Sequence, residues 1–123
     1  MKKLLAFLAL IAITYPSTAM ARELVEVSTS TDGTKTYVWR DTIRRANNFV
    51  WWTEEHILYG AAGKLNTHDI VDYSGDCSQG IYRILKDKNV LTGRVNATPD
   101  AQSEIVTPGS VGETVLNYVC GKN

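Results

Sequence analysis

The stretch that decides the fold is residues 108–120, which reads P-G-S-V-G-E-T-V-L-N-Y-V-C. Ser110 and Glu113 fit a capping box, in which the Ser110 hydroxyl accepts from the Glu113 amide and the Glu113 carboxylate reaches back. Apolar side chains then recur at helical spacing, at Val111, Val115, Leu116 and Val119. The segment predicts a helix of about ten residues that begins after Ser110 and ends at Cys120.

The opposite end of the chain has the pattern of a cleavable signal peptide. Lys2 and Lys3 precede an apolar run over residues 4–13, and A-M-A at residues 19–21 forms a small-residue cleavage site. Spanning a bilayer takes roughly 20 apolar residues, so this run is too short to remain as an anchor. We expect a signal peptide over residues 1–21 and export, and no cysteine follows the run to form a lipid anchor.

The exported part, residues 22–123, is long enough for one hydrophobic core and is expected to be a single domain. Cleavage leaves 102 residues with 11 basic and 13 acidic side chains, a formal charge of about −2. A nucleic acid would release few counterions on binding such a surface, which argues against a nucleic-acid partner. The same charge argues against strong attraction to anionic lipid. No later segment is apolar enough to predict a membrane span.

The two cysteines of the chain, Cys77 and Cys120, both lie in the exported part. Cys120 ends the predicted helix of about ten residues. Because such a short helix is marginal alone, its apolar stripe must pack on the rest of the protein. In an oxidising compartment a disulfide is the default for a lone pair, and closing a loop of about 43 residues stabilises by roughly 4 kcal/mol. The alternatives are free thiols or a metal pair, but a structural zinc takes four ligands and only His56 and His68 accompany the cysteines.

A hairpin is predicted near the start of the exported part. Residues 23–28 alternate charged and apolar side chains, and T-D-G-T at residues 31–34 supplies the Asp-Gly signal of a tight turn before residues 35–40. The polar residues 41–48 are expected to form a connection. We therefore expect two paired strands here.

Residues 49–59, F-V-W-W-T-E-E-H-I-L-Y, are dense in aromatic and β-branched side chains and predict the longest strand. With a period of two, Trp51 and Trp52 lie on opposite faces of that strand. The simpler interpretation is that both faces are covered and both tryptophans lie in the core. The alternative is that one of them lies on an exposed apolar patch, which usually marks an interaction surface.

Further strands are expected at residues 65–73, 80–85 and 90–97, with turns at 74–76 and 86–89 and Gly93 inside the last strand. The polar residues 98–107, with Pro99 and Asp100 as breakers, are expected to be a surface loop. The chain thus predicts an α+β fold, an antiparallel sheet of about six strands with the C-terminal helix packed on it and tied to it by the disulfide.

No constellation in the sequence predicts catalysis, a metal site or a cofactor. Ser110 stands outside a G-x-S-x-G pattern and is better used as a helix cap. E-E-H at residues 54–56 points alternate side chains to opposite faces, and H-D-x-x-D at residues 68–72 has no established ligand spacing. Asp76 and Arg83 are expected to form an ion pair that orients the disulfide corner.

Several of these elements, taken in order, resemble the bacterial surface-adhesin protein E family. The matching elements are residues 37–43, 50–52, Asp76-Cys77, Tyr82-Arg83, Gly93 and residues 105–120. The similarity extends over residues 36–120, although Ser103-Glu104 stand where the family commonly has a tryptophan. It implies an antiparallel sheet with a C-terminal helix tied across it by the disulfide.

The resemblance also implies a function, which is the binding of host or environmental macromolecules at the bacterial surface. Trp39, Trp51 and Trp52 are then the expected binding surface. The alternative is a periplasmic accessory or structural protein that docks on another envelope component or forms a homodimer through an edge strand.

Overall fold

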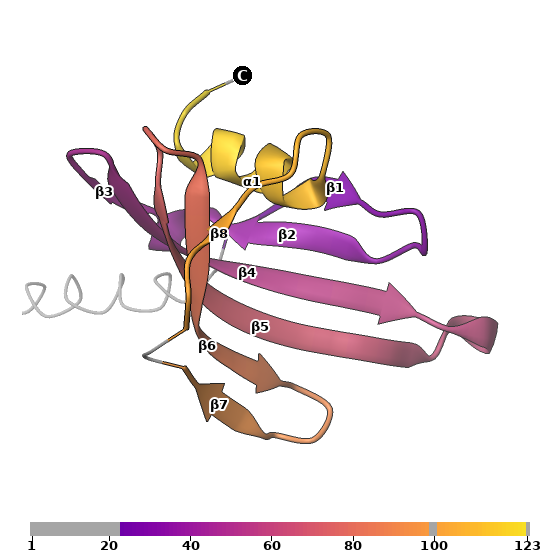
Figure 1. The fold of residues 1–123 in the computed structure, drawn as a ribbon. Coiled ribbons are helices and arrows are strands. Elements are labelled where there is room, and N and C mark those ends of the chain that lie inside the picture. Colours follow the sequence, from indigo (N-terminus) through magenta and orange to yellow (C-terminus); the bar gives the residue numbers. More distant parts are fainter. Residues whose placement is uncertain (1–22, 99–100, 123) are drawn as a thin grey trace, which may run out of the picture.

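The computed structural model describes residues 23–98 and 101–122 (Figure 1). The predicted signal peptide and the breakers Pro99 and Asp100 fall outside these residues. The described part is an antiparallel sheet of eight strands with the C-terminal helix packed on one face, which confirms the predicted fold class. Within it, no helix is long and apolar enough to cross a membrane.

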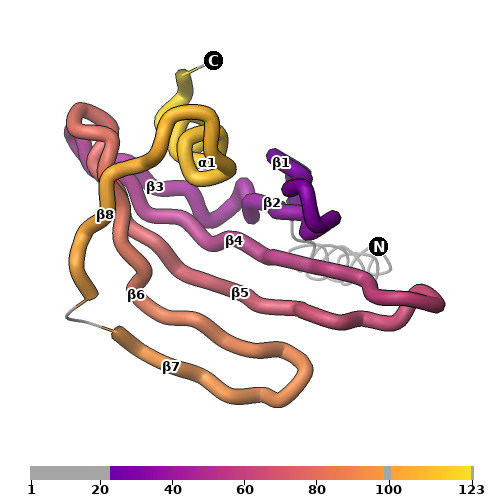
Figure 2. Tube along the Cα trace, turned by 45° about the vertical axis from the view of Figure 1, so that its right-hand side comes forward, coloured from indigo at the N-terminus to yellow at the C-terminus, as the bar shows by residue number. Residues whose placement is uncertain are grey.

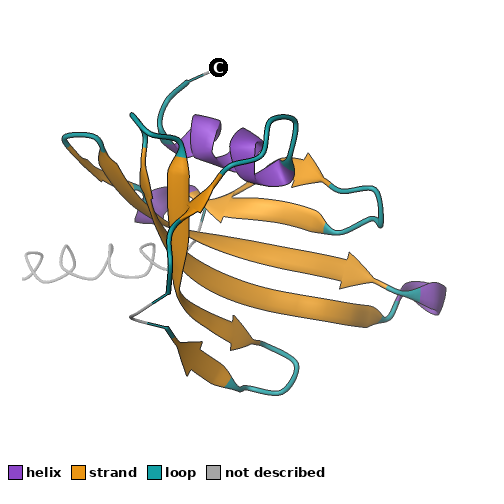
Figure 3. Cartoon of the chain, viewed as in Figure 1, coloured by secondary structure: helices purple, strands orange, loops and turns teal. Residues whose placement is uncertain are grey.

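The strands are β1 (Leu24–Thr29), β2 (Lys35–Trp39), β3 (Arg44–Ala46), β4 (Phe49–Tyr59), β5 (Leu65–Asp76), β6 (Ile81–Asn89), β7 (Val95–Ala97) and β8 (Glu104–Ile105). Their order in the sheet is β1-β2-β4-β5-β6-β7, with β3 paired to β4 and β8 paired to β6. Figure 3 shows that helix within the described residues is confined to α1 (Val111–Val119) and to two short 3-10 turns, Arg40–Thr42 and Ala61–Gly63.

The first hairpin forms as predicted, because β1 and β2 pair antiparallel across the Asp-Gly turn. Gly33 has a φ of 92°, a conformation that glycine adopts without a steric penalty. The Asp32 carboxylate accepts from the Ser30 hydroxyl at 2.7 Å and from the Thr34 amide at 2.9 Å. These bonds close the turn and lower the pKa of Asp32.

The two turns predicted at residues 74–76 and 86–89 are wrong, because both segments continue their strands. β5 runs through Asp76 and β6 runs through Asn89, and the chain reverses after each of them instead. With twelve residues β5 is longer than β4, which has eleven. The polar side chains that resembled turns lie in strand ends, where Lys86 pairs with Asp72 across the ladder.

Two short strands lie in segments that were expected to be irregular. β3 falls within residues 41–48 and pairs with the start of β4, and β8 falls within residues 98–107 and pairs with the start of β6. Gly93, expected inside a strand, lies in the β6–β7 turn with a φ of 79°. The sheet therefore has eight strands, not six, in the part of the chain that the structure describes.

The core lies between the sheet and α1. Its buried side chains come from alternate positions of the central strands and from one face of the helix: Val38, Val50, Trp52, Val71, Tyr73, Val115, Leu116 and Val119. In Figure 2 the tips of the β3–β4 and β5–β6 hairpins rise beside the helix, while β7 lies far from it. The helix therefore leaves the other face of the sheet uncovered.

The start of α1 is capped at the predicted residues. Ser110 Oγ accepts from the Glu113 amide at 3.2 Å. The Glu113 carboxylate reaches back one residue further than in the standard box, to the Gly109 amide at 2.9 Å. The first bond satisfies an amide that the helix itself leaves without a partner, and the second holds the residue before the N-cap.

The other end of α1 is tied to the tips of two hairpins. The disulfide between Cys77 and Cys120 is formed, with the two Cα atoms 5.8 Å apart, which confirms the prediction. Lys122 Nζ donates to the Cys77 carbonyl at 2.9 Å, and Arg45 Nε donates to the Val119 carbonyl at 2.6 Å. The covalent bond thus lies within a set of polar contacts that fix the helix end.

Candidate functional site

Trp51 and Trp52 are neighbours in the chain but have different surroundings. Trp52 faces α1 and is 3% exposed, whereas Trp51 lies on the opposite face and is 41% exposed. The expectation that both tryptophans lie in the core is therefore wrong for Trp51, and the alternative of one exposed tryptophan holds. Trp52, in turn, is too deeply buried to belong to a binding surface.

The surroundings of Trp52 explain its burial. Its ring stacks on Tyr73 at 5.3 Å between centroids, and Nε1 donates to Glu54 Oε2 at 2.7 Å. The other Glu54 oxygen lies 2.8 Å from His56 Nε2, so both oxygens of this buried carboxylate have partners. As predicted for E-E-H, Glu54 and His56 share one face and Glu55 lies on the other.

A small cavity and a neutral phenol accompany this buried cluster. The small cavity beside it has about 160 Å³ and is lined on one side by residues of α1. Burial raises the pKa of Tyr73, so this phenol stays protonated at all physiological pH values. Glu54 is thus hydrogen-bonded to Trp52 and His56, and Tyr73 stays neutral against the Trp52 ring.

The face turned away from α1 holds a row of side chains that crosses four strands. The ladder pairs Arg44 with Trp51, Trp51 with Ser74, and Ser74 with Arg83. Directly opposite residues in antiparallel strands project to the same face, so these four side chains lie side by side. In this row Trp51 and Ser74 thus lie between two arginines.

A second, mostly apolar row lies beside the first. The same ladder pairs Ala46 with Phe49, Phe49 with Asp76, Asp76 with Ile81, and Ile81 with Ile105. Phe49 is 51% exposed and Ile105 is 77% exposed. We call seven members of the two rows, some exposed and some partly buried, the aromatic-basic face: Arg44, Phe49, Trp51, Ser74, Ile81, Arg83 and Ile105.

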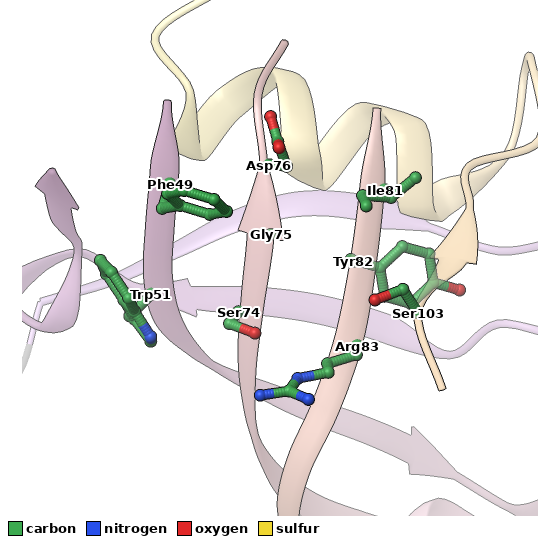
Figure 4. A pocket seen from close by; sticks show the side chains of 9 residues that line it. All are labelled: Phe49, Trp51, Ser74, Gly75, Asp76, Ile81, Tyr82, Arg83 and Ser103. Atoms are coloured by element: carbon green, nitrogen blue, oxygen red, sulfur yellow. The ribbon is translucent and has the colours of Figure 1, made fainter. Parts of the chain in front are cut away.

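An open pocket of about 370 Å³ is hollowed into the aromatic-basic face (Figure 4). It is lined by Phe49, Trp51, Ser74, Gly75, Asp76, Ile81, Tyr82, Arg83 and Ser103. The Phe49 and Trp51 rings are 6.5 Å apart and tilted by 40°. In Figure 4 these rings form one side, and the Arg83 side chain extends over Ser74 from the other side.

Asp76 lines the pocket but does not pair with Arg83 as predicted. Its Oδ1 accepts from the Ser78 hydroxyl at 2.7 Å, from the Ser78 amide at 2.9 Å and from the Gln79 amide at 3.2 Å. These bonds build the turn before Gly80, and the Ser78 hydroxyl is the main cause that lowers the pKa of Asp76. The carboxylate is directed toward the turn, since three short bonds hold it there.

Arg83 has no ion-pair partner among the residues that the structure describes. The ion pairs among residues 23–98 and 101–122 join Arg40 to Glu23, His56 to Glu54, His68 to Glu55 and Lys86 to Asp72. No hydrogen bond or ion pair of these residues involves the Arg83 or Arg44 side chain. Arg44 is exposed and Arg83 is partly buried, so both guanidinium groups lack an ion-pair partner among the described residues.

Trp39 lies on the same face of the sheet but outside the pocket. Its Nε1 donates to Glu55 Oε1 at 2.9 Å, and the second Glu55 oxygen is hydrogen-bonded to His68 Nε2. Trp39 is partly buried by these contacts. Of the three tryptophans expected to form a binding surface, the structure thus places only Trp51 at the pocket.

The remaining members of the aromatic-basic face were not predicted. Phe49 and Arg83 are far apart in the sequence, and only the register of β4, β5 and β6 brings them together. Alternation along β4 is the one local signal that places Phe49 with Trp51. As for metals, the described residues hold no cluster of three or more His, Cys, Asp or Glu side chains that could bind an ion.

Comparisons with known proteins do not add to this picture. No family model matches the chain, and no curated protein or solved structure matches it. The resemblance to the surface-adhesin protein E family therefore stays a prediction from the sequence motifs.

Proposed function

We propose that this chain is an exported binding module without enzymatic activity, which contacts a macromolecule through the aromatic-basic face. The observation that carries the proposal is the exposure of Trp51 and Phe49 beside an unpaired Arg83. Tryptophan and arginine are the side chains that most often dominate the binding energy of protein interfaces. Contiguous exposed apolar patches usually mark interaction sites, and the Phe49 and Trp51 rings lie next to each other on this face.

Two further features support this proposal. The disulfide between Cys77 and Cys120 is typical of proteins that work outside the reducing cytoplasm. In addition, the resemblance to the surface-adhesin protein E family implies the binding of host or environmental macromolecules. We therefore propose adhesion as the role of the aromatic-basic face.

The test is the binding of the oxidised exported domain to an immobilised basement-membrane extract, measured by surface plasmon resonance. We expect Trp51→Ala to weaken binding about tenfold or more, as for an interface hot spot. Tyr59→Ala is the matched control, because Tyr59 is a 58% exposed aromatic residue at the far end of β4. Equal binding by the two variants, or no binding by the unmodified domain, contradicts the proposal.

A second experiment separates adhesion from the alternative of a periplasmic accessory or structural protein. Intact cells are treated with an external protease, and the chain is then detected by immunoblotting. An adhesin displayed at the surface is degraded, whereas a periplasmic protein is protected until the outer envelope is opened. Protection in intact cells therefore contradicts the adhesive role and favours a partner within the envelope.

A further inference from the structure

The carboxylates on the face turned away from α1 are already engaged by the protein itself. Asp72 accepts from the Thr53 hydroxyl at 2.8 Å and lies 3.6 Å from Lys86 Nζ. Glu55 is held by Trp39 and His68, and Asp76 by the turn that follows it. The acidic groups of this face are therefore satisfied, while its arginines are not.

Arg44 and Arg83 lie at the two ends of one row. Adjacent strands are about 4.8 Å apart, so three steps across the ladder separate the two residues by roughly 14 Å. Guanidinium groups bind carboxylates through two parallel hydrogen bonds. The row thus presents two separate carboxylate-binding groups on backbone positions roughly 14 Å apart, and the Arg83 side chain extends over Ser74 toward Trp51 (Figure 4).

An extended peptide has the matching repeat. It rises about 3.3 Å per residue, so side chains at positions i and i+4 project to the same side roughly 13 Å apart. Acidic side chains at these positions would reach Arg44 and Arg83 together. An apolar side chain at position i+2 would lie against Trp51, beside the apolar row that contains Phe49 and Ile81.

We propose that the aromatic-basic face binds an extended acidic peptide segment of a protein partner, in which two carboxylates flank an apolar side chain. This proposal rests on the proposed function and names the chemistry of its ligand. Two arginines about 14 Å apart suit isolated carboxylates better than a phosphate backbone or an anionic membrane, which require a denser array of cations. The formal charge of about −2 on residues 22–123 adds no such array.

The test uses three fluorescein-labelled peptides with blocked ends, and fluorescence anisotropy measures their binding to the oxidised exported domain. The first contains Glu-Thr-Leu-Thr-Glu, and in the other two Gln or Lys replaces both Glu residues. We expect the Glu peptide to bind about tenfold more tightly than the Gln peptide, since each charge-assisted hydrogen bond contributes strongly. The Lys peptide should bind most weakly, and added salt should reduce the difference.

Two variants locate the binding. Arg83→Gln should weaken the Glu peptide about tenfold and leave the Gln peptide unchanged, because only the charged contact is lost. Lys86→Gln is the matched control, since Lys86 lies on the same strand but pairs with Asp72. Equal affinities for the Glu and Gln peptides, or equal effects of the two variants, overturn the proposal.

The failure of this proposal differs from the failure of the proposed function. If Trp51→Ala abolishes binding to the basement-membrane extract while Arg83→Gln does not, the aromatic-basic face binds a macromolecule of another chemistry. If neither variant affects that binding, the proposed function fails as well. Vesicles with phosphatidylglycerol are a third probe, and Arg83-dependent binding to them without binding of the Glu peptide assigns the face to an anionic membrane instead.

Discussion

Gly75 of β5 lies directly beneath Leu116 of α1. A Cβ atom at Gly75 would come within 3.0 Å of Leu116 Cδ1, 3.1 Å of the Ile81 carbonyl oxygen and 3.2 Å of Trp52 Cζ3. The helix can approach β5 this closely because the strand carries no side chain at the point of contact. The glycine is therefore required by packing, although its φ is not in the left-handed region.

Gly75→Ala should lower the free energy of unfolding by about 1–3 kcal/mol, because the new methyl group overpacks the core and one of its neighbours is backbone. The control is Gly60→Ala, where the nearest atom would lie at an ordinary contact distance of 3.5 Å. Urea denaturation followed by circular dichroism measures both variants. A Gly75→Ala protein as stable as the control would show that the helix shifts freely on the sheet.

Gly75 also shows why the turn predicted at residues 74–76 was wrong. S-G-D at residues 74–76 has the composition of a turn, but the helix and the paired strands hold it in β5. The helix cap, the disulfide and the first hairpin could be predicted because each depends on residues close in sequence or on the only two cysteines. Gly75 is required by its contact with Leu116, which lies 41 residues later in the chain. The sequence around Gly75 therefore contains no local signal that separates it from a turn glycine.

The candidate site was predictable only in part for a related reason. Alternation along β4 places Trp51 and Trp52 on opposite faces, but which face is covered depends on where α1 docks. Arg83 joins Trp51 through Ser74, and this relationship follows from the register of three strands. A period of two within one strand carries no information about the register of its neighbours.

Truncation of the two tryptophans should change the free energy of unfolding to very different extents. Trp52→Ala removes a buried ring that stacks on Tyr73 and should cost about 3–5 kcal/mol. Trp51→Ala alters a side chain that is 41% exposed and should change stability by about 0.5 kcal/mol or less. Chemical denaturation measures both values. If Trp51→Ala proves as destabilising as Trp52→Ala, the exposed face is part of the core and Trp51→Ala is no longer a clean binding variant.

Removal of the disulfide should release the end of α1. The bond closes a loop with a sequence separation of 43, for which loop closure predicts about 4 kcal/mol of stabilisation. Cys77→Ser and Cys120→Ser should each lower the melting temperature far more than a surface substitution does, and hydrogen exchange should become fast first in α1. Equal melting temperatures for the oxidised and reduced protein would contradict the role assigned to this bond.

The helix cap makes a smaller and separate contribution. Ser110→Ala removes the acceptor of the Glu113 amide and should cost about 1 kcal/mol. Ser110→Asp restores an acceptor at the helix N-terminus and should recover most of that loss. Thermal denaturation of the three proteins checks this order. The Ser110 hydroxyl also donates to the Thr107 carbonyl. A Ser110→Ala protein with unchanged stability would show that neither hydrogen bond of this hydroxyl stabilises the start of α1.

The Asp76 carboxylate should make stability depend on acid. Hydrogen bonds from Ser78 and Gln79 lower the pKa of Asp76 in the folded protein below the value of about 3.9 of an unfolded chain. Its contribution is therefore fully present above about pH 5 and is lost as the pH falls through the lowered pKa. Asp76→Asn keeps an acceptor for the same donors but removes the charge, so the variant should be less stable at neutral pH and should approach the wild type at strongly acidic pH.

Melting temperatures of both proteins across the acid range test this prediction. Asp32, whose pKa is also lowered, is present in both proteins, so its effect cancels in the comparison. A stability difference that stays constant down to strongly acidic pH would show that the charge of Asp76 does not hold the turn beside the disulfide.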